Sequence, residues 1–227
     1  MEFSVQRVIR RLYEPFAAPE KRWDVRPLQT AFCTKGVTRV KILIVYFTQT
    51  KNTEKVATGI YEELLTHGHE VHIEKIEGIT PGILEDYSII FMGSACHDAD
   101  LAQPVKQFLE GIPHSPPYKM AGFVTHSTFT GEGGNREREL YDQWAGKCIK
   151  SFNQVSQEKN LDFLGYFHCR GSPTPEIADF VHRVILTDED EWNQYKDEVA
   201  KHPDEEDIQR AKEFADTVLL EFRRLTA

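Results

Sequence analysis

Short apolar runs alternate with amphipathic segments from about Val40 onward, and this alternation limits the possible folds more than any other feature. Most of the runs are apolar throughout, as expected for strands buried on both faces of a parallel sheet. The run VHIEKI alternates more, which is typical of an edge strand. The five runs are KILIVYF (41–47), VHIEKI (71–76), SIIFMG (88–93), MAGFVTH (120–126) and FLGYFH (163–168).

Helical spacing occupies most of the intervals between these runs. Apolar residues recur every three or four positions within 56–64, 105–112 and 140–155, and the last of these predicts one longer helix. The final helix opens with a proline and acids and ends with arginines, as suits the helix dipole. EGITPGILEDY, between the second and third runs, is too short for a full helix and predicts a bent crossover. Together these patterns predict an α/β fold, a doubly wound five-stranded parallel sheet with helices on both faces.

Two stretches lie outside this scheme. Residues 1–38 place apolar residues at helical spacing beside arginines, which predicts an amphipathic N-terminal extension ahead of a domain spanning 39–227. The extension could pack against the domain, make a homodimer with a sister subunit, or bind a membrane surface. Residues 171–202 form a long, partly helical excursion before the final helix, and long insertions are often functional.

Charge and cysteine content exclude several classes of protein. The chain of 227 residues has a formal net charge of -9, which argues against nucleic acid as a partner and suits basic protein partners. Four cysteines without a C-x-x-C pair predict neither a disulfide framework nor a metal site. No apolar run is long enough to span a membrane, and the basic start lacks the apolar core of a signal peptide. We therefore expect a cytoplasmic protein.

The first run passes directly into a helix through TQTKNT, a stretch rich in hydroxyls. Ligands of open parallel sheets bind outside the carboxyl ends of the strands. Backbone N–H groups at a helix start point at an anion, and threonine hydroxyls can donate further hydrogen bonds, so this stretch predicts a phosphate site. It has neither a P-loop nor a G-x-G-x-x-G pattern, and the alternative is that its side chains only cap the helix. The candidate ligands are Thr48, Gln49, Thr50, Lys51, Asn52 and Thr53.

VYFTQTKNTEKVA resembles the phosphate loop of the flavodoxin family, in which hydroxyl residues and backbone amides hold the phosphate of FMN. The resemblance extends over about 40–225. The family's third strand, a flavin-contacting loop and the following helix resemble DYSIIFMGSACHDADLAQPVKQFLEGI. The family's fourth strand and its flavin loop resemble MAGFVTHSTFTGEGGN. It implies a flavodoxin-like fold with FMN as cofactor. Lys51 departs from the family, since many flavodoxins carry glycine there; we expect the lysine to fit only with a negative φ.

The same resemblance implies that two loops border the isoalloxazine ring. In the loop 93–101, backbone amides would reach flavin N5 or O4, but Cys96 and His97 stand where electron-carrier flavodoxins usually have aromatic residues. In the loop 125–135, Phe129 is the candidate for stacking on the ring, or it pins the loop to the body of the domain. The candidate contacts are Gly93, Ser94, Ala95, Cys96, His97, Ser127, Thr128, Phe129 and Gly131.

Three functions remain open from the sequence. The first is an FMN-binding redox protein that transfers electrons to or from protein partners, with no catalytic residue of its own because the flavin carries the chemistry. The second is an FMN-dependent NAD(P)H or quinone reductase of the same fold, with the stretch 171–202 as a lid. The third is a flavin-free interaction module, a hypothesis that the Lys51 departure favours.

Overall fold

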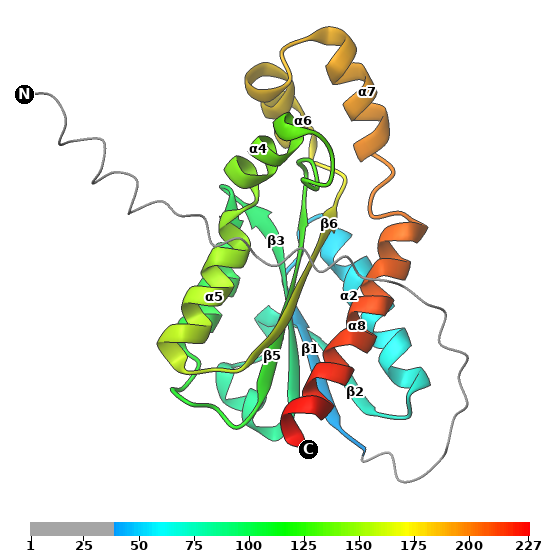
Figure 1. Ribbon diagram of the computed structural model, residues 1–227. Coiled ribbons are helices and arrows are strands. Elements are labelled where there is room, and N and C mark those ends of the chain that lie inside the picture. Colours follow the sequence, from blue (N-terminus) through cyan, green and yellow to red (C-terminus); the bar gives the residue numbers. More distant parts are fainter. Residues whose placement is uncertain (1–38) are drawn as a thin grey trace, which may run out of the picture. The chain divides into compact units, whose positions relative to one another are not determined.

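The computed structural model describes residues 39–227 (Figure 1). Residues 1–38, with the expected amphipathic extension and its homodimer contact, lie outside the described residues. Five parallel strands form one sheet in the order β2-β1-β3-β5-β6, so the predicted fold class is confirmed. The strands are β1 (Lys41–Tyr46), β2 (Glu70–Lys75), β3 (Ile89–His97), β5 (Lys119–His126) and β6 (Phe163–Arg170).

The strand register places apolar side chains on both faces of the sheet. In β1, Ile44 lies beside Ile73 of β2 and Phe91 of β3. The alternating strand β2 is an edge strand, as predicted, and β6 forms the other edge. A further strand of two residues, β4 (Asp100–Leu101), pairs antiparallel with the end of β3. The sequence did not indicate β4, because so short a strand has no periodicity of its own.

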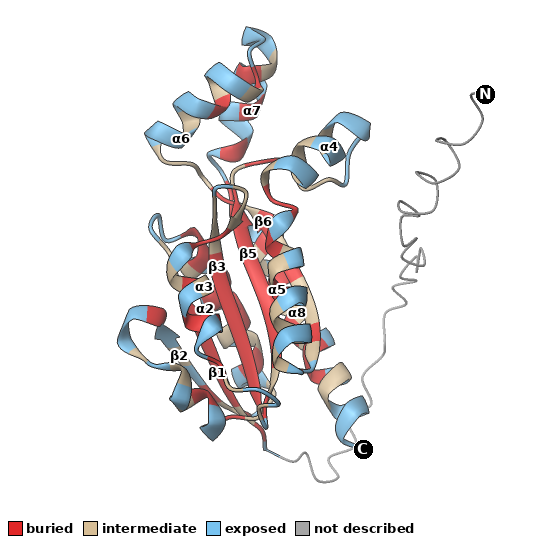
Figure 2. Cartoon of the chain, turned by 90° about the vertical axis from the view of Figure 1, so that its left-hand side faces the viewer, coloured by how far each residue is buried: buried red, intermediate tan, exposed pale blue. Residues whose placement is uncertain are grey.

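Two helices cover each face of the sheet, and the core is divided accordingly. Ile42 and Ile44 pack with α2 (Asn52–Thr66) and α8 (Glu205–Thr226), whereas Leu43 and Val45 pack with α3 (Gln103–Glu110) and α5 (Lys147–Lys159). Figure 2 shows the buried residues concentrated along the strands and the exposed ones on the outer sides of the helices. None of the helices within residues 39–227 is long and apolar enough to cross a membrane.

Connections between the elements follow local sequence chemistry. The expected bent crossover consists of two short 3-10 helices, η1 (Ile76–Gly78) and η2 (Pro81–Asp86). The last helix begins with a capping box, in which Asp204 Oδ1 accepts from the Asp207 backbone N–H (2.9 Å) and Asp207 Oδ2 from the Asp204 N–H (3.1 Å). Two of the acids at this end, Asp204 and Asp207, therefore stabilise the first turn of α8.

The single longer helix predicted for 140–155 is wrong. The structure has α4 (Asn135–Trp144) and α5, separated at Ala145 and Gly146. Both of these backbone N–H groups donate to the Tyr141 carbonyl oxygen at 2.8 Å, which closes the first helix. A Cβ at position 146 would lie 2.8 Å from the Asp142 backbone, so only glycine allows this tight turn. The apolar residues of α4 and α5 continue the same helical spacing in the sequence, so the pattern predicted one helix where there are two.

Residues 171–202, which we call the cap, form a small helical unit beyond the carboxyl ends of the strands (Figure 1). The cap contains α6 (Pro175–Phe180), the π-helix η3 (Val181–Ile185) and α7 (Glu189–Val199). It has its own apolar cluster, against which Phe129 and Leu140 of the sheet domain pack. The cap therefore holds the loop that follows β5.

Candidate functional site

The predicted phosphate loop lies between β1 and α2, at the carboxyl edge of the sheet. Lys51 is the N-cap residue of α2 and has a φ of 65°, in the left-handed region. The expectation of a negative φ at this position is therefore wrong. The strain costs roughly 1–2 kcal/mol for a residue with a Cβ, which explains why glycine suits this position.

Two hydroxyls in this loop have hydrogens to donate. Thr48 Oγ1 is buried and has no partner among the described residues. Thr50 Oγ1 accepts a hydrogen bond from the Asn52 amide at 2.9 Å, which leaves the threonine hydrogen free for another acceptor. The same Asn52 amide nitrogen donates to the Ser172 carbonyl oxygen at 2.8 Å and so ties the loop to the start of the cap.

Other residues of the loop have structural partners or face solvent. Thr53 Oγ1 lies 2.9 Å from Thr125 Oγ1, and this buried pair joins the start of α2 to the end of β5. Gln49 and Lys51 are exposed at the rim. Glu54, the acid in the first turn of α2, lies 3.5 Å from Lys75, which compensates its charge.

This arrangement fits a phosphate. The first-turn N–H groups of α2 have no intrahelical acceptor, and the positive end of the helix dipole favours an anion there. Within residues 39–227 the buried Thr48 hydroxyl has no acceptor, and an unmet buried hydroxyl costs about 1–3 kcal/mol. An oxygen-rich dianion held at this edge would supply the missing acceptors for both the amides and the hydroxyl.

The second predicted loop, 93–101, is mostly strand. β3 continues to His97, and a two-residue turn at Asp98 and Ala99, with φ of 51° and 64°, leads back into β4. Gly93 faces the core, since a Cβ there would lie 2.3 Å from the Phe123 ring. Ser94 is buried, and its hydroxyl accepts from the Ala102 N–H at 3.0 Å.

Ala95, Cys96 and His97 are half-buried at the tip of this hairpin. The Cys96 thiol donates to the Trp144 carbonyl oxygen at 3.4 Å, and the His97 ring meets the Phe47 ring edge-on at 5.8 Å. Burial lowers the pKa of His97, and the nearby Asp98 carboxylate opposes that shift. The imidazole is therefore favoured as a neutral group at the tip.

The loop after β5 is held by the cap. The Ser127 hydroxyl donates to the Gly171 carbonyl oxygen at 3.0 Å, and the Tyr195 hydroxyl donates to the Ser127 carbonyl oxygen. Phe129 packs on the Tyr195 ring with centroids 5.6 Å apart, so in this structure its ring pins the loop to α7. Thr128 is buried beside it, and Gly131 turns the chain with a φ of 79°.

A stack of histidines and tyrosines lies next to this loop, and the sequence does not predict it. His126, at the end of β5, is within 3.0 Å of His168 of β6, ring nitrogen to ring nitrogen. The Tyr141 ring of α4 stacks on the His168 ring with centroids 4.6 Å apart, and the Tyr166 ring stacks on His168 with centroids 5.6 Å apart. Burial lowers the pKa of His168 to about 4 and holds that of His126 well below its usual value. The only sequence signal was a histidine at the end of each of two adjacent strands.

A cavity of about 380 Å³ opens between this loop, α4 and α7. Phe129 and Tyr195 form its apolar wall. Arg170, at the end of β6, faces it and donates to Glu198 of α7 at 3.0 Å. The cavity thus combines an aromatic wall with a partly compensated cation next to one of the predicted flavin loops. Its remaining charged lining residues are Glu137 and Glu191.

Sequence comparisons agree with the fold. A family model described as a flavodoxin domain matches residues 43–216. An uncharacterized protein of Methanocaldococcus jannaschii is 29% identical over 181 residues, which cover 79% of this chain and 99% of that protein. The flavodoxin-like domain-containing protein BilS of Clostridioides difficile is 28% identical over 188 residues, which cover 80% of this chain and 97% of that protein.

Two solved flavodoxins are similar to this chain in fold. Oxidised flavodoxin 2 from Bacillus cereus superposes with a TM-score of 0.54 at 22% identity and covers 80% of this chain and 99% of its own. A short-chain flavodoxin associated with a bacterial microcompartment has a TM-score of 0.54 at 13% identity, with 80% and 97% of the two chains covered. At these identities the likeness shows the fold alone.

Proposed function

This chain belongs to the flavodoxin family, and from that premise we propose that it is an FMN-binding redox protein that exchanges electrons with protein partners. The family implies a flavin cofactor. When bound, FMN supplies the one- and two-electron chemistry, and the protein supplies binding, orientation and electrostatics. The residues of this chain that would bear on the cofactor are those of the phosphate loop, the β3–β4 hairpin and the loop after β5.

The observation that carries the proposal is the buried Thr48 hydroxyl, which has no partner among the described residues and lies in the loop that leads into the free N–H groups at the start of α2. A phosphate distinguishes FMN from riboflavin, and this edge of the sheet offers backbone and hydroxyl donors that suit a phosphate. Thr50 adds a second donor, because Asn52 occupies its acceptor side. FMN is thus the flavin that these donors suit.

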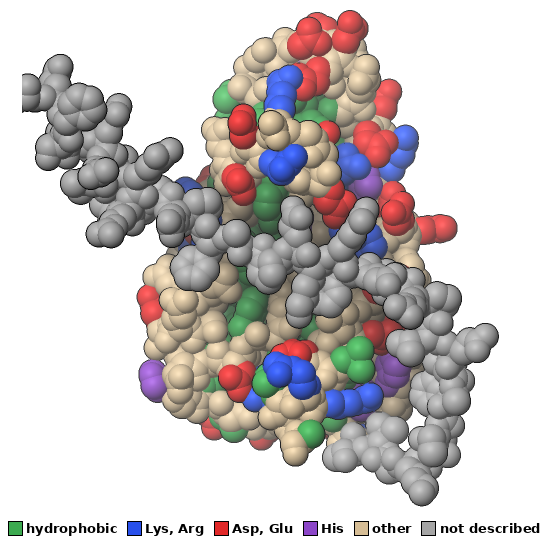
Figure 3. Space-filling view, viewed as in Figure 1, with side chains coloured by type: hydrophobic (Ala, Val, Ile, Leu, Met, Phe, Trp, Pro, Cys, Tyr) green, Lys and Arg blue, Asp and Glu red, His purple; other side chains and the backbone are tan. Residues whose placement is uncertain are grey.

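The charge of the cap supports basic proteins as partners. Figure 3 shows acidic side chains on this end of the molecule. Complementary charge speeds encounter and sets orientation more than it adds affinity, so an acidic cap would steer a basic redox partner toward the flavin edge. The cap has eight acids, Glu176, Asp179, Asp188, Glu189, Asp190, Glu191, Asp197 and Glu198, and three lysines or arginines, Arg183, Lys196 and Lys201.

A second candidate function is an FMN-dependent NAD(P)H or quinone reductase. The cavity walled by Phe129 and Tyr195 favours it, because this space beside a flavin loop could take a small second substrate. Consumption of NAD(P)H with a quinone and no partner protein would support the reductase. Electron exchange only with a basic partner protein would support the carrier.

The first prediction concerns the phosphate loop. Thr48→Ala should weaken FMN binding by about 1.5–3 kcal/mol, since it removes a hydrogen bond to a charged group. Fluorescence titration of flavin-free protein with FMN measures the change. Thr58→Ala is the matched control, because this exposed threonine of α2 bonds only the Glu54 carbonyl oxygen, and it should leave the affinity unchanged.

Unchanged FMN affinity in Thr48→Ala would rule out this phosphate site. A protein that is colourless as isolated and that FMN cannot reconstitute would overturn both redox functions and leave a flavin-free interaction module. The absorbance spectrum of the purified chain is therefore the first measurement to make.

A further inference from the structure

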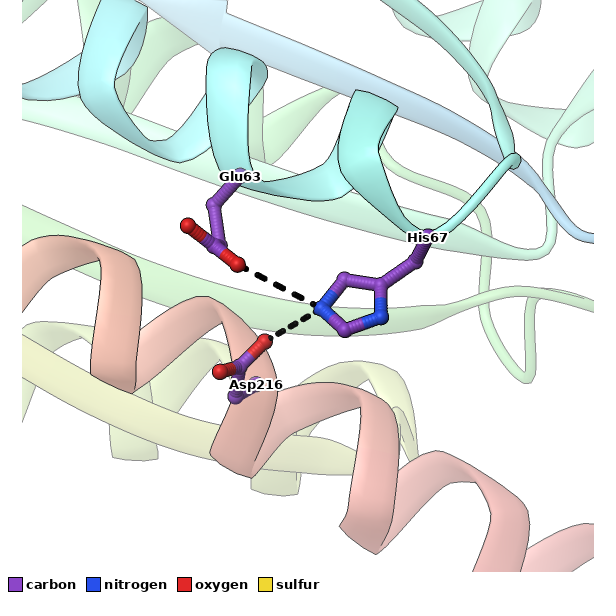
Figure 4. A group of neighbouring side chains, drawn as sticks. All are labelled: Glu63, His67 and Asp216. Carbon is purple, nitrogen blue, oxygen red and sulfur yellow. Dashed lines mark hydrogen bonds and ion pairs between the residues drawn. The ribbon is translucent and has the colours of Figure 1, made fainter. Parts of the chain in front are cut away.

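Three side chains converge on one point at the end of α2 that lies away from the phosphate loop (Figure 4). Glu63 and His67 are one helical turn apart, and Asp216 faces them from α8. His67 Nε2 lies 2.7 Å from Asp216 Oδ1 and 3.5 Å from Glu63 Oε1. All three candidate ligand atoms lie within 4.8 Å of one another.

The two carboxylates are not compensated by basic residues. Across residues 39–227, neither Glu63 nor Asp216 has a lysine or arginine partner, and Lys212, one turn earlier on α8, instead pairs with Glu62 at 3.1 Å. The Thr66 hydroxyl reaches Glu63 Oε1 at 3.3 Å but brings no charge. A single imidazole nitrogen carries at most one hydrogen, so it cannot donate fully to both carboxylates at once.

The position along the helix also favours a cation. α2 ends at Thr66, and His67 is its C-cap residue. Carbonyl oxygens without intrahelical partners give this end a partial negative charge, which adds to that of the two carboxylates. The His69 ring stacks on His67 with centroids 6.3 Å apart, and this contact limits the rotation of the His67 ring.

We propose that Glu63, His67 and Asp216 bind a divalent transition-metal cation of the Zn²⁺ class. One imidazole nitrogen and two carboxylate oxygens are ligands that such ions accept, with bonds of about 2.0–2.2 Å. Ligand atoms at the corners of a tetrahedron of that size lie about 3.4 Å apart. The Glu63–His67 distance of 3.5 Å already matches, and the Asp216–His67 distance of 2.7 Å needs to open by less than 1 Å.

A bound cation would join α2 to α8, the two helices that cover one face of the sheet. The half-buried position, with 25% of the His67 side chain exposed, leaves a coordination position for water. The inference does not depend on FMN, since the cluster lies at the opposite end of α2 from the phosphate loop.

Isothermal titration of the full-length chain with Zn²⁺, after treatment with a chelator, tests the proposal. We expect one equivalent to bind in the wild type. His67→Gln keeps a hydrogen-bond donor toward Asp216 but removes the imidazole ligand, and should weaken this binding at least about tenfold. Asp216→Asn, which keeps the side-chain shape, should weaken it similarly. His114→Gln, at an exposed histidine elsewhere, should bind Zn²⁺ as the wild type does.

A thermal melt with and without Zn²⁺ gives a second readout. The melting temperature of the wild type and of His114→Gln should rise with Zn²⁺, whereas that of His67→Gln should not. No Zn²⁺ binding in the wild type, or equal binding in His67→Gln and the wild type, would overturn the proposal. Circular dichroism of both ligand variants checks that they are folded, and Asp216→Asn keeps the test valid should His67→Gln fail to fold.

Discussion

At the scale of single residues, Lys51 combines a structural cost with an exposed position in the phosphate loop. Its backbone is left-handed, with a φ of 65°, although nothing in the described chain forms a hydrogen bond with its side chain. The conformation is imposed by its neighbours: β1 must end and α2 must begin within a few residues so that the helix start faces the loop. The strained residue therefore follows from the tight passage from β1 into α2.

Lys51→Gly should stabilise the flavin-free protein by about 1 kcal/mol, because glycine adopts a positive φ without the Cβ clash. Urea denaturation measures this free energy of unfolding. Lys55→Gly, at an exposed position with ordinary helical geometry in α2, is the control and should destabilise by about 1 kcal/mol. A loss of stability in Lys51→Gly would show that the lysine side chain contributes more than its backbone costs.

His168 should make the stability depend on pH. Its pKa is about 4 when folded, below the usual 6.5, because burial disfavours the charged ring. Between these two values the unfolded chain binds a proton that the folded chain does not, so stability falls as the pH is lowered from about 6.5 toward 4. The fall is at most about 1.4 kcal/mol per pH unit for this residue.

His168→Gln should remove that part of the pH dependence, while His126, whose pKa burial also lowers, still contributes its own part. Urea denaturation at several pH values between 4 and 7 compares the slopes, and the exposed His114→Gln is the control. A slope identical to that of the wild type would mean that the pKa of His168 is the same in the folded and the unfolded chain.

At the scale of elements, the cap and the hairpin decide what surrounds the proposed flavin edge. The β3–β4 hairpin presents Ala95, Cys96 and His97 from a strand instead of a free loop. Its acid Asp100 is held by the Ser151 hydroxyl at 2.6 Å and by Lys106 at 3.3 Å. The proposed flavin edge is thus bordered by the hydrogen-bonded β3–β4 hairpin and by the loop after β5, whose position depends on the cap.

Phe129→Ala should loosen α7 without loosening the sheet. The phenyl ring is the part of the β5 loop that packs with the cap cluster, so its loss removes packing that holds α7 in place. Each 1.4 kcal/mol lost would speed amide exchange in α7 about tenfold. Hydrogen exchange should leave α8 unchanged, and Ile177→Ala, at an exposed position of α6, should leave both helices unchanged. Equal acceleration in α7 and α8 would contradict a role of Phe129 confined to the cap.

At the scale of the whole molecule, cofactor binding should couple to folding, because the phosphate loop contacts elements distant in the sequence. Asn52 bonds Ser172, and Thr53 pairs with Thr125, so the loop exists only when β1, β5 and the start of the cap are in place. A ligand that binds only this assembled state stabilises it by mass action.

FMN at 100 times its dissociation constant should raise the free energy of unfolding by about 2.7 kcal/mol. Urea denaturation with FMN and with riboflavin, which lacks the phosphate, measures the gain. Riboflavin at the same concentration should give a smaller gain if the phosphate is held as proposed. Equal gains from the two flavins would show that the phosphate contributes nothing to binding.

Much of the fold could be predicted because its strands and helices follow from residue patterns within single elements. The apolar strands, the edge strand β2, the bent crossover and the charged ends of α8 each depend on the residues within one element. The break at Ala145 and Gly146 could not be predicted, because α4 and α5 present apolar residues in a common stripe and only the backbone contact at Asp142 requires two helices.

By itself, the sequence determined that a hydroxyl-rich turn joins the first strand to the first helix, and therefore where an anion is expected. Tertiary structure alone decided the partners of the hydroxyls: Thr53 Oγ1 is paired with Thr125 Oγ1, whereas the buried Thr48 Oγ1 has no partner in the described part of the chain. It also brought together His126 with His168, and Glu63 with Asp216, pairs that are far apart in the chain. The physical reason is that strand and helix patterns are local, whereas a polar atom's partner is set by which elements the packed core places side by side.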